Sequence, residues 1–425
     1  AMPPLILVPP AGRHAVVRGD VIDGPARVQN GDPRGTYVYV GRARPVATAE
    51  VIAVVDPGMP RWLVEWLEAG LPRVMHRYGQ LTGLAPRTRP TVLYTYHDDG
   101  SPGRSAGGGT LPGLITIALT GDGWGTPTDA ARAEAFQLLA HEAFHLWNGE
   151  RVTNAPAPTG AWIHEGSADV FATGASLHLG ALDSASARGA QEAALNRCAM
   201  ALARGSVESA LARGQPRMVY DCGQVMAWWT GLALRSLNGG RSLDTFWRDL
   251  LAAGLAAGGE YDAALYIGLL ARQGAGPATI TAMQAFLTGS GTDSIAVAAL
   301  QALGAPIVVH ADPPTGVDQG ALVAEAFAHL MQAACGRASF YGGAPIRTVP
   351  VSGCSGFARE RHIARIAELP VGSAGAAIHD AVAARCAANG EVSIEEVDGS
   401  REAIPCTRPL QRRPPWYEVR ALIVP

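Results

Sequence analysis

The sequence predicts an α+β fold in which a small mixed sheet leads into a helical bundle, with a short β segment before them and an α+β module after them. Three observations support this prediction. Residues 51–125 contain short apolar runs separated by glycine and proline, residues 126–311 change to the period of amphipathic helices, and four of the six cysteines lie in the last part of the chain. The 425 residues, 48% hydrophobic and 17% charged, are enough for two or three folded domains.

The first part of the chain is predicted to form strands and one long helix. Apolar runs alternate with glycine and proline over residues 1–50, which predicts an N-terminal β segment. After a strand and tight turn at VIAVVDPGMP, the apolar stripe of residues 60–83 predicts an amphipathic helix. Residues 91–99 and 114–119 predict two more strands, and the glycine-rich stretch AGGGTLPG between them (106–113) predicts a loop.

A helical region follows these strands. The segment PTDAARAEAFQLLAHEAFHLWNG has helical periodicity, with Thr128 or Asp129 as its capping residue and Gly149 as its stop. Helical segments continue to about residue 305, interrupted by stretches rich in glycine, proline and asparagine. We therefore expect the sheet region and the helical region, together residues 51–311, to form one domain.

The last part of the chain predicts a separate module. DPPTG (312–316) has the composition of a linker. Residues 317–425 contain short strands such as EVSIEEVDG and WYEVRALIV together with four of the six cysteines. These features predict a small α+β domain.

Charge and cysteine content exclude several classes of protein. A formal charge of -3 favours neither a nucleic acid nor an anionic membrane as partner. No apolar run approaches the roughly 20 residues of a membrane-spanning helix. The six cysteines form no C-x-x-C pair, which fits disulfides in an exported protein, although six free thiols in a cytosolic protein are the alternative. We expect a periplasmic or secreted protein on the basis of these cysteines, and because Ala1 precedes Met2 we expect that its signal peptide is absent from this sequence.

The stretch HEAFHLWN (141–148) is the strongest functional signal. On a helix, His141 and His145 project from the same face one turn apart, so both imidazoles can bind one metal ion, and Glu142 points toward the same rim. A catalytic zinc takes three protein ligands and leaves a fourth position for water. The alternative is a pair of core histidines whose ring nitrogens bond to backbone carbonyls.

The third ligand is predicted on the next helix. The loop RVTNAPAPTG is long enough to reverse the chain, and the helix AWIHEGSADVFATGASL carries Glu165 and, one turn later, Asp169. This spacing predicts Glu165 as a zinc ligand and Asp169 as a carboxylate that accepts a hydrogen bond from a ligand imidazole. His164 is an alternative ligand, but it lies about 100° around the helix from Glu165.

These motifs resemble a known family. HEAFHLWN followed by WIHEGSAD is similar to the gluzincin zinc metallopeptidases, in which H-E-x-x-H is completed by a glutamate on the next helix, and within them to the glycyl aminopeptidase family. Weaker matches such as YDCGQVMAW and RSLDTFWRDLL extend the resemblance over roughly residues 36–310. It implies a thermolysin-like catalytic domain at residues 51–311. It also implies a PDZ-like C-terminal module, for which an unrelated disulfide-linked domain is the alternative.

The resemblance also implies roles for the residues of the motif. His141, His145 and Glu165 would be the ligands of a Zn²⁺ cofactor. Glu142 would be the general base that takes a proton from water, and Asp169 would orient His141.

Tyr220 and Cys222 lie in the stretch YDCG, which matches the family's Y-x-K-G. The resemblance implies that the Tyr220 hydroxyl faces the tetrahedral oxyanion, and a core tyrosine near a helix start is the alternative. Cys222 stands where the family has lysine, so this wall of the site departs from the family pattern. Cys198 and Cys222, placed across a helical hairpin, predict a disulfide near the site, with two separate thiols as the alternative.

The resemblance finally implies a peptidase that acts on a peptide or protein substrate. Gly107, Gly108 and Gly109 would bind the substrate backbone by strand addition, whereas a plain flexible hairpin is the alternative. We expect an aminopeptidase. A zinc endopeptidase is the alternative, because no residue is predicted to bind a free amino terminus, and the competing class is a catalytically weak protein of the same fold that binds peptides.

Overall fold

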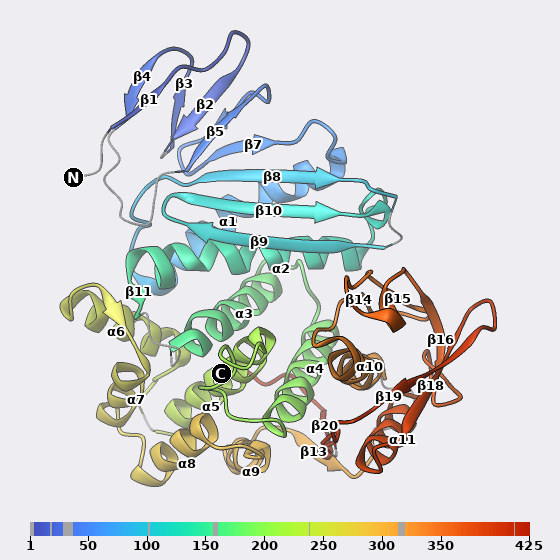
Figure 1. Ribbon diagram of the computed structural model, residues 1–425. Helices are drawn as coiled ribbons and strands as arrows, with labels where there is room; N and C mark the ends of the chain where they lie inside the picture. The colour runs from blue at the N-terminus through green and yellow to red at the C-terminus, as the bar shows by residue number, and fades with distance from the viewer. Residues whose placement is uncertain are drawn as a thin grey trace.

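A computed structural model describes residues 4–17, 19–28, 37–100, 103–155, 160–237, 239–312, 319–411 and 413–425. Helices and small sheets are both present, so the predicted α+β fold class is confirmed (Figure 1). In Figure 1 the N-terminal strands lie at the top above a larger sheet, the helical bundle lies below that sheet, and the C-terminal module lies beside the bundle.

Two small antiparallel sheets form the N-terminal segment. Their strands are β1 (Leu5–Leu7), β2 (His14–Val17), β3 (Asp20–Ile22), β4 (Ala26–Val28) and β5 (Val38–Gly41). β1 pairs with β4, and β2 lies between β3 and β5. Buried Val16 packs against Ile52 and Val54, and these contacts attach the segment to the larger sheet.

A five-stranded mixed sheet follows, made of β6 (Val46–Ala47), β7 (Ile52–Val55), β8 (Thr91–His97), β9 (Ser105–Leu111) and β10 (Leu114–Thr120). Its order is β6-β7-β8-β10-β9, so β9 is an edge strand (Figure 1). The loop predicted at 106–113 is wrong, because most of these residues belong to β9. Pairing with β10 along its whole length, from Ser105 opposite Thr120 to Leu111 opposite Leu114, outweighs the low strand propensity of glycine.

Helices α1 (Arg61–Thr82) and α2 (Asp129–His145) pack against this sheet (Figure 1). The apolar stripe of α1 shares the main core with the inward-facing residues of β8 and β10. Helix α2 begins as the sequence predicts, and the Thr128 hydroxyl accepts a hydrogen bond from the backbone N–H of Ala131.

Helix α2 does not end at Gly149, where the sequence predicted a stop. After His145 the chain continues as a π-helical turn, Leu146–Arg151. A Cβ atom on Gly149 would lie 2.8 Å from Cε1 of His164. The glycine therefore permits close approach of the next helix rather than terminating this one.

The remaining helices of the bundle are α3 (Ala161–His178), α4 (Ser184–Leu202), α5 (Pro216–Ser236), α6 (Leu243–Ala256), α7 (Ala263–Arg272), α8 (Pro277–Thr288) and α9 (Asp293–Ala302). Helices α3 and α5 cross at a pair of glycines. A Cβ atom on Gly166 would lie only 2.2 Å from the carbonyl carbon of Gly223. The two backbones thus touch about two turns into α5.

The C-terminal module has its own core, which includes buried Phe327, Ile363 and Ile394. Its elements are α10 (Gly320–Cys335), β14 (Phe340–Tyr341), β15 (Ile346–Thr348), β16 (His362–Ile366), β17 (Leu369–Pro370), α11 (Gly375–Ala387), β18 (Glu391–Glu396) and β19 (Arg401–Pro405). The strands form one antiparallel sheet. Its PDZ-like character stays a prediction, and residues 313–316 of the predicted linker lie outside the described residues.

The module is bounded by two strands that pair with each other, β13 (Ile307–His310) and β20 (Trp416–Val419). The residues at and after β20 pack into the main core, although the predicted module of 317–425 includes them. The Gln191 side chain on α4 donates to the carbonyl of Ile423 at 2.7 Å and accepts from its N–H at 2.8 Å. The last residues of the chain are therefore fastened to the helical bundle, where Figure 1 marks the C-terminus.

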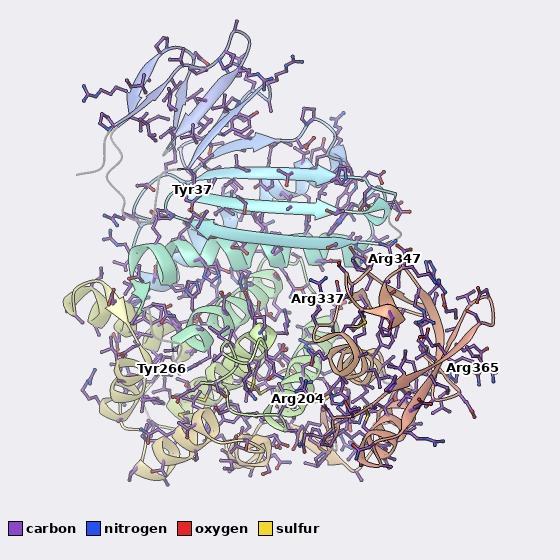
Figure 2. The ribbon with its side chains drawn as sticks, viewed as in Figure 1. Tyr37, Arg204, Tyr266, Arg337, Arg347 and Arg365 are labelled. Atoms are coloured by element: carbon purple, nitrogen blue, oxygen red, sulfur yellow. A yellow bond between two sulfur atoms is a disulfide. The ribbon has the colours of Figure 1, made fainter. Side chains whose placement is uncertain are left out.

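Polar contacts also join the bundle to the module. Arg204, labelled in Figure 2, lies at their junction, with Nη1 3.1 Å from Oε1 of Glu325. Nε2 of His379 lies 3.8 Å from Oε2 of Glu325. His379 is 1% exposed, and its ring nitrogens have no hydrogen-bond partner among the described residues.

Within the described residues, no helix combines the length and the apolar character needed to cross a bilayer.

Candidate active site

Helix α2 brings the three charged or polar residues of the H-E-x-x-H motif to one buried face. The Nε2 atoms of His141 and His145 lie 3.1 Å apart, and both side chains are buried. Their rings meet edge to face with centroids 4.8 Å apart, so both Nε2 atoms face the same point. Glu142 is 6% exposed and lies at the rim of the same site.

Helix α3 adds the carboxylate of Glu165. Its Oε2 atom lies 3.3 Å from Nε2 of His141 and 3.5 Å from Nε2 of His145. A tetrahedral zinc ion with bonds of about 2.0–2.1 Å keeps its ligands roughly 3.3 Å apart, so the triangle of donor atoms fits such an ion. Glu165 Oε2 is also buried without a hydrogen-bond partner among the described residues, as expected of an atom whose partner is a metal.

His164 does not join this triangle. Its ring stacks on that of His145, with centroids 4.1 Å apart, and its Nδ1 lies 3.1 Å from the carbonyl oxygen of Asn148. Burial, together with the neighbouring His145, lowers the pKa of His164 to about 3. The structure thus brings Glu165, and not the alternative ligand, to the two imidazoles.

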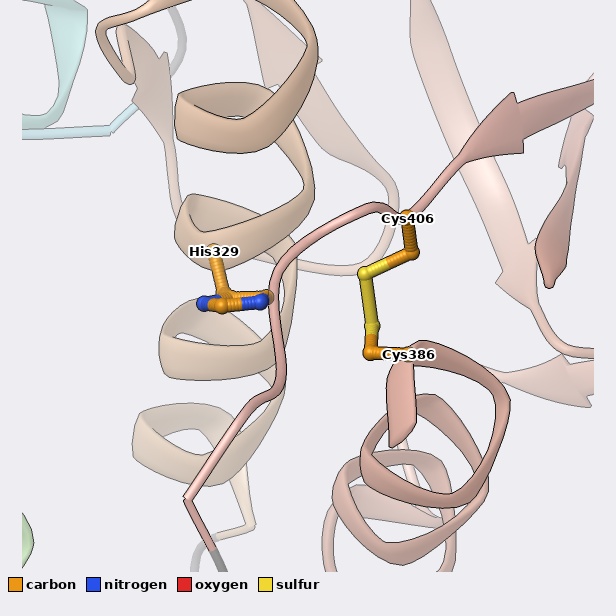
Figure 3. A group of neighbouring side chains, drawn as sticks. All are labelled: His329, Cys386 and Cys406. Carbon is orange, nitrogen blue, oxygen red and sulfur yellow. A yellow bond between two sulfur atoms is a disulfide. The ribbon is translucent and has the colours of Figure 1, made fainter. Parts of the chain in front are cut away.

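A second group of potential ligands lies in the module. Sγ atoms of Cys386 and Cys406 lie near His329, but Figure 3 shows the two cysteines joined in a disulfide. Nε2 of His329 lies 2.8 Å from the carbonyl oxygen of Arg408. Since thiolates bind metals and disulfides do not, we assign no metal to this group.

Each ligand imidazole has a partner on its other nitrogen. Nδ1 of His141 lies 2.8 Å from Oδ1 of Asp169, whose Oδ2 accepts a hydrogen bond from Gln224 at 3.0 Å. Nδ1 of His145 lies 2.8 Å from Oδ1 of Asn148. An imidazole that donates through Nδ1 presents the lone pair of Nε2, so both rings are held in the tautomer that binds a metal.

Asn148 and Gln224 are positioning residues that the sequence analysis did not single out. Asn148 lies on the π-helical turn, is fully buried, and donates to the carbonyl of His164 at 2.8 Å and to the Ser167 hydroxyl at 3.2 Å. Its place three residues after the second histidine, in the stretch HLWN, was the available signal.

The electrostatics of the site favour a cation. Burial lowers the pKa of His141, but the hydrogen bond with Asp169 and the neighbouring Glu165 carboxylate outweigh burial and raise it to about 10. Burial raises the pKa of Glu165, but the neighbouring imidazoles of His141 and His145 outweigh this effect and hold the pKa far below its ordinary value. The carboxylates therefore stabilise positive charge between the two imidazoles.

Tyr220 lies on the first turns of α5, and its ring stacks on His141 with centroids 5.8 Å apart and planes 20° apart. Burial and the neighbouring Glu165 carboxylate raise the pKa of Tyr220. Cys222 is fully buried and forms a disulfide with Cys198 on α4, as the sequence predicted. It is absent from the cleft lining, so the cysteine that replaces the family's lysine does not form the wall of the site.

The edge strand β9 forms the opposite side of the site. A Cβ atom on Gly108 would lie 2.7 Å from Cγ and Oε1 of Glu142, so a larger residue at this position would displace the carboxylate. Gly107 has open space, and Gly109 has ordinary contact with Thr116. The Thr110 hydroxyl, another contact that the sequence analysis missed, lies 2.9 Å from Oε2 of Glu142.

Comparisons with known proteins identify a similar fold among solved structures. No family model matches the sequence, and no curated protein matches it. Among solved structures, an aminopeptidase N family protein from Idiomarina loihiensis matches with a TM-score of 0.57 and 12% identity, over 96% of this chain and 75% of that one. The chain shares the fold of that protein. Native yeast LTA4 hydrolase matches with a TM-score of 0.48 and 12% identity, over 75% of this chain and 49% of that one.

In this fold, the site opens into a cleft of about 420 Å³ between β9 and helices α2, α3, α4 and α5. Its lining includes His141, Glu142, Asp169 and Tyr220. The cleft therefore places a candidate metal centre, a carboxylate and a hydroxyl beside the free edge of a strand.

Proposed function

We propose that this protein is a zinc-dependent peptidase. One observation carries the proposal: the donor atoms of His141, His145 and Glu165 form a triangle of the size that a tetrahedral zinc ion needs, next to the Glu142 carboxylate. A bound Zn²⁺ would supply Lewis acidity and lower the pKa of a water molecule in the site. The other steps below belong to residues of the chain.

Glu142 is the proposed general base. Its carboxylate is held between Gly108 and the Thr110 hydroxyl, which restricts where the carboxylate points. In this position Glu142 would take the proton of the attacking water and return it to the leaving amine. The raised pKa of Tyr220 keeps its hydroxyl protonated at neutral pH, so it can donate a hydrogen bond to the oxyanion of the tetrahedral intermediate.

Strand β9 is the proposed substrate-binding edge. Gly107 and Gly108 are exposed, and β9 pairs with β10 on one side only. An extended peptide could add to the free edge through backbone hydrogen bonds, and glycines on the strand leave room for it. This arrangement supports a peptide or protein as the substrate.

The finer assignment concerns which peptides are cleaved. The shared fold favours aminopeptidase activity. A second candidate, an endopeptidase, is favoured by the cleft itself: its only described lining carboxylates are Glu142 and Asp169, and both already have proposed roles. No further lining carboxylate among the described residues would bind the ammonium of a free amino terminus.

Two experiments test these proposals. Zinc analysis of chelator-free protein should give about one ion per chain for wild type and for Glu142→Gln, with hydrolysis lost only in the variant. Full hydrolysis by Glu142→Gln would remove Glu142 as the base, and zinc binding without hydrolysis by wild type would favour a peptide-binding protein. Cleavage of a peptide and its N-acetylated twin at equal rates would favour the endopeptidase.

We further propose that the protein is exported. Three disulfides, Cys198–Cys222, Cys335–Cys354 and Cys386–Cys406, use all six cysteines. Such bonds persist in oxidising compartments. Fractionation of the cells that make the protein would test this location: the protein should be found in the periplasmic or secreted fraction and not in the cytosol.

A further inference from the structure

One end of the cleft carries an ion-pair network between α4 and α5. Arg197 on α4 forms two hydrogen bonds with Asp221 on α5, with Nε 3.0 Å from Oδ2 and Nη2 2.7 Å from Oδ1. The next residues along each helix, Cys198 and Cys222, form the disulfide. The covalent bond and the ion pair therefore fix the two helices together at the same level.

A second arginine shares the same carboxylate. Nη2 of Arg217 lies 3.4 Å from Oδ1 of Asp221, one helical turn away on α5. The Asp221 side chain is 2% exposed and already accepts both bonds from Arg197, whereas the Arg217 side chain is 62% exposed. Two guanidinium groups thus face one carboxylate, and this end of the cleft carries an excess positive charge at Arg217.

Fold stability does not explain this second arginine. An exposed pair at i and i+4 stabilises a helix only weakly, and Asp221 is satisfied without Arg217. No other carboxylate among the described residues lies within ion-pair distance of Arg217. With 62% of its side chain exposed and its one carboxylate neighbour already bonded twice to Arg197, Arg217 can bind a further anion.

The position of Arg217 links it to the proposed chemistry. Its guanidinium carbon lies 5.4 Å from the centroid of the Tyr220 ring, and that ring in turn stacks on His141. Arg197 and Arg217 both line the cleft that contains Glu142. A negative group on a substrate bound in the cleft could therefore meet Arg217 on one side of the Tyr220 ring while His141 lies against the same ring.

We propose that Arg217 binds a carboxylate of the substrate and makes this protein selective for acidic peptides. The inference rests on the proposed peptidase function and deepens it. Guanidinium binds carboxylate through two parallel hydrogen bonds, so arginine suits this role better than a point charge. The carboxylate belongs either to an aspartate or glutamate side chain or to the free carboxyl terminus, and the experiment separates these sources.

The test uses two pairs of matched peptides with the zinc-loaded full chain. In the first kind of pair, the two peptides carry glutamate or glutamine at one position, and this position is varied along the peptide. In the second kind, the two peptides have a free or an amidated carboxyl terminus. Wild type should prefer the carboxylate member of at least one pair by about tenfold or more in kcat/KM, the range expected of a hydrogen bond to a charged group. Arg217→Gln should abolish that preference, and Arg217→Lys should restore it in part.

Arg61→Gln is the matched control, because Arg61 is 92% exposed and pairs with Glu65 at i and i+4 on a helix that does not line the cleft. It should keep the full preference. The proposal is overturned if wild type hydrolyses both members of each pair equally, or if Arg217→Gln keeps the wild-type preference.

A binding measurement separates this inference from the peptidase proposal. Calorimetry of the same peptides with zinc-loaded Glu142→Gln, with and without Arg217→Gln, reports selectivity without turnover. If wild type hydrolyses no peptide, the proposed function fails, and a carboxylate preference in binding that disappears with Arg217→Gln still supports the site. Equal binding of both members of each pair would refute the proposed carboxylate site at Arg217.

Discussion

Gly108→Ala offers the sharpest test of how β9 positions the carboxylate of Glu142, the proposed general base. The added Cβ would lie 2.7 Å from Cγ and Oε1 of Glu142, and roughly 0.8 Å of movement would be needed to reach ordinary contact of about 3.5 Å. Strand β9 is tied to β10 opposite Ile117, so the flexible end of Glu142 would move instead. A misplacement near 1 Å costs about 10²-fold in rate, so we expect that loss in kcat/KM with little change in stability.

The neighbouring glycines provide controls on the same strand. An added Cβ has no atom within 4 Å at Gly107 and meets Thr116 Oγ1 at 3.5 Å at Gly109, so neither alanine should move Glu142, and any loss in these two variants reports contact of β9 with the substrate. The assay is steady-state hydrolysis by protein with measured zinc content and measured Tm. Near-normal activity of Gly108→Ala would refute the reasoning. An equal loss in all three variants would indicate substrate contact along β9 rather than displacement of Glu142.

Three further predictions concern metal binding, pH and packing. Asn148→Ala should weaken zinc affinity by about 10–100-fold, as measured by competition with a chelator, because the variant loses the partner that orients a ligand imidazole; an unchanged affinity would contradict this role. Burial lowers the pKa of His379 from 6.5 to about 4, so the folded protein binds fewer protons than the unfolded chain in that window and loses stability as pH falls through it. Urea unfolding should therefore show that the free energy of unfolding falls more steeply between pH 7 and 5 for wild type than for His379→Gln, by at most about 1.4 kcal/mol per pH unit. Equal slopes for the two proteins would argue against this role of His379. Gly166→Ala should lower the free energy of unfolding by about 1–3 kcal/mol, because the added Cβ meets the backbone of Gly223. Gly174→Ala on the same helix is the control, because its Cβ meets nothing within 4 Å and should stabilise the protein slightly. Similar effects of the two substitutions would contradict the close crossing of α3 and α5.

Local sequence patterns predicted most of the fold because helix and strand periods report local burial. The capping threonine of α2 and the amphipathic stripe of α1 are examples. The glycine-rich strand β9 was mistaken for a loop, because its stability comes from partner residues on β10 and not from its own side chains. The pairing of β20 with β13 could not be predicted either, since no local signal identifies a partner strand that lies across a whole module.

The same distinction applies to the site. Spacing predicted that His141, His145 and Glu165 would meet, because a helix fixes the first two and a short loop returns the third. The roles of these residues stay predictions until metal and activity are measured. Asn148 was not predicted, because its contact with His145 depends on the π-helical turn. Arg217 was not predicted either, because only the structure shows that Arg197 makes both hydrogen bonds to Asp221 and leaves the charge of Arg217 in excess.

The pairing of β13 with β20 makes residues 311–415 an insertion within a continuous structural unit. His310 and Trp416 are opposite each other on adjacent strands, so a two-residue turn could join them into a hairpin. A shortened protein of this kind would keep every buried residue of the main core, whereas truncation after residue 311 would remove Tyr417, Val419 and Ile423 from it. A single cut therefore cannot separate the main core from the C-terminal module, and internal excision is the route to the main core alone.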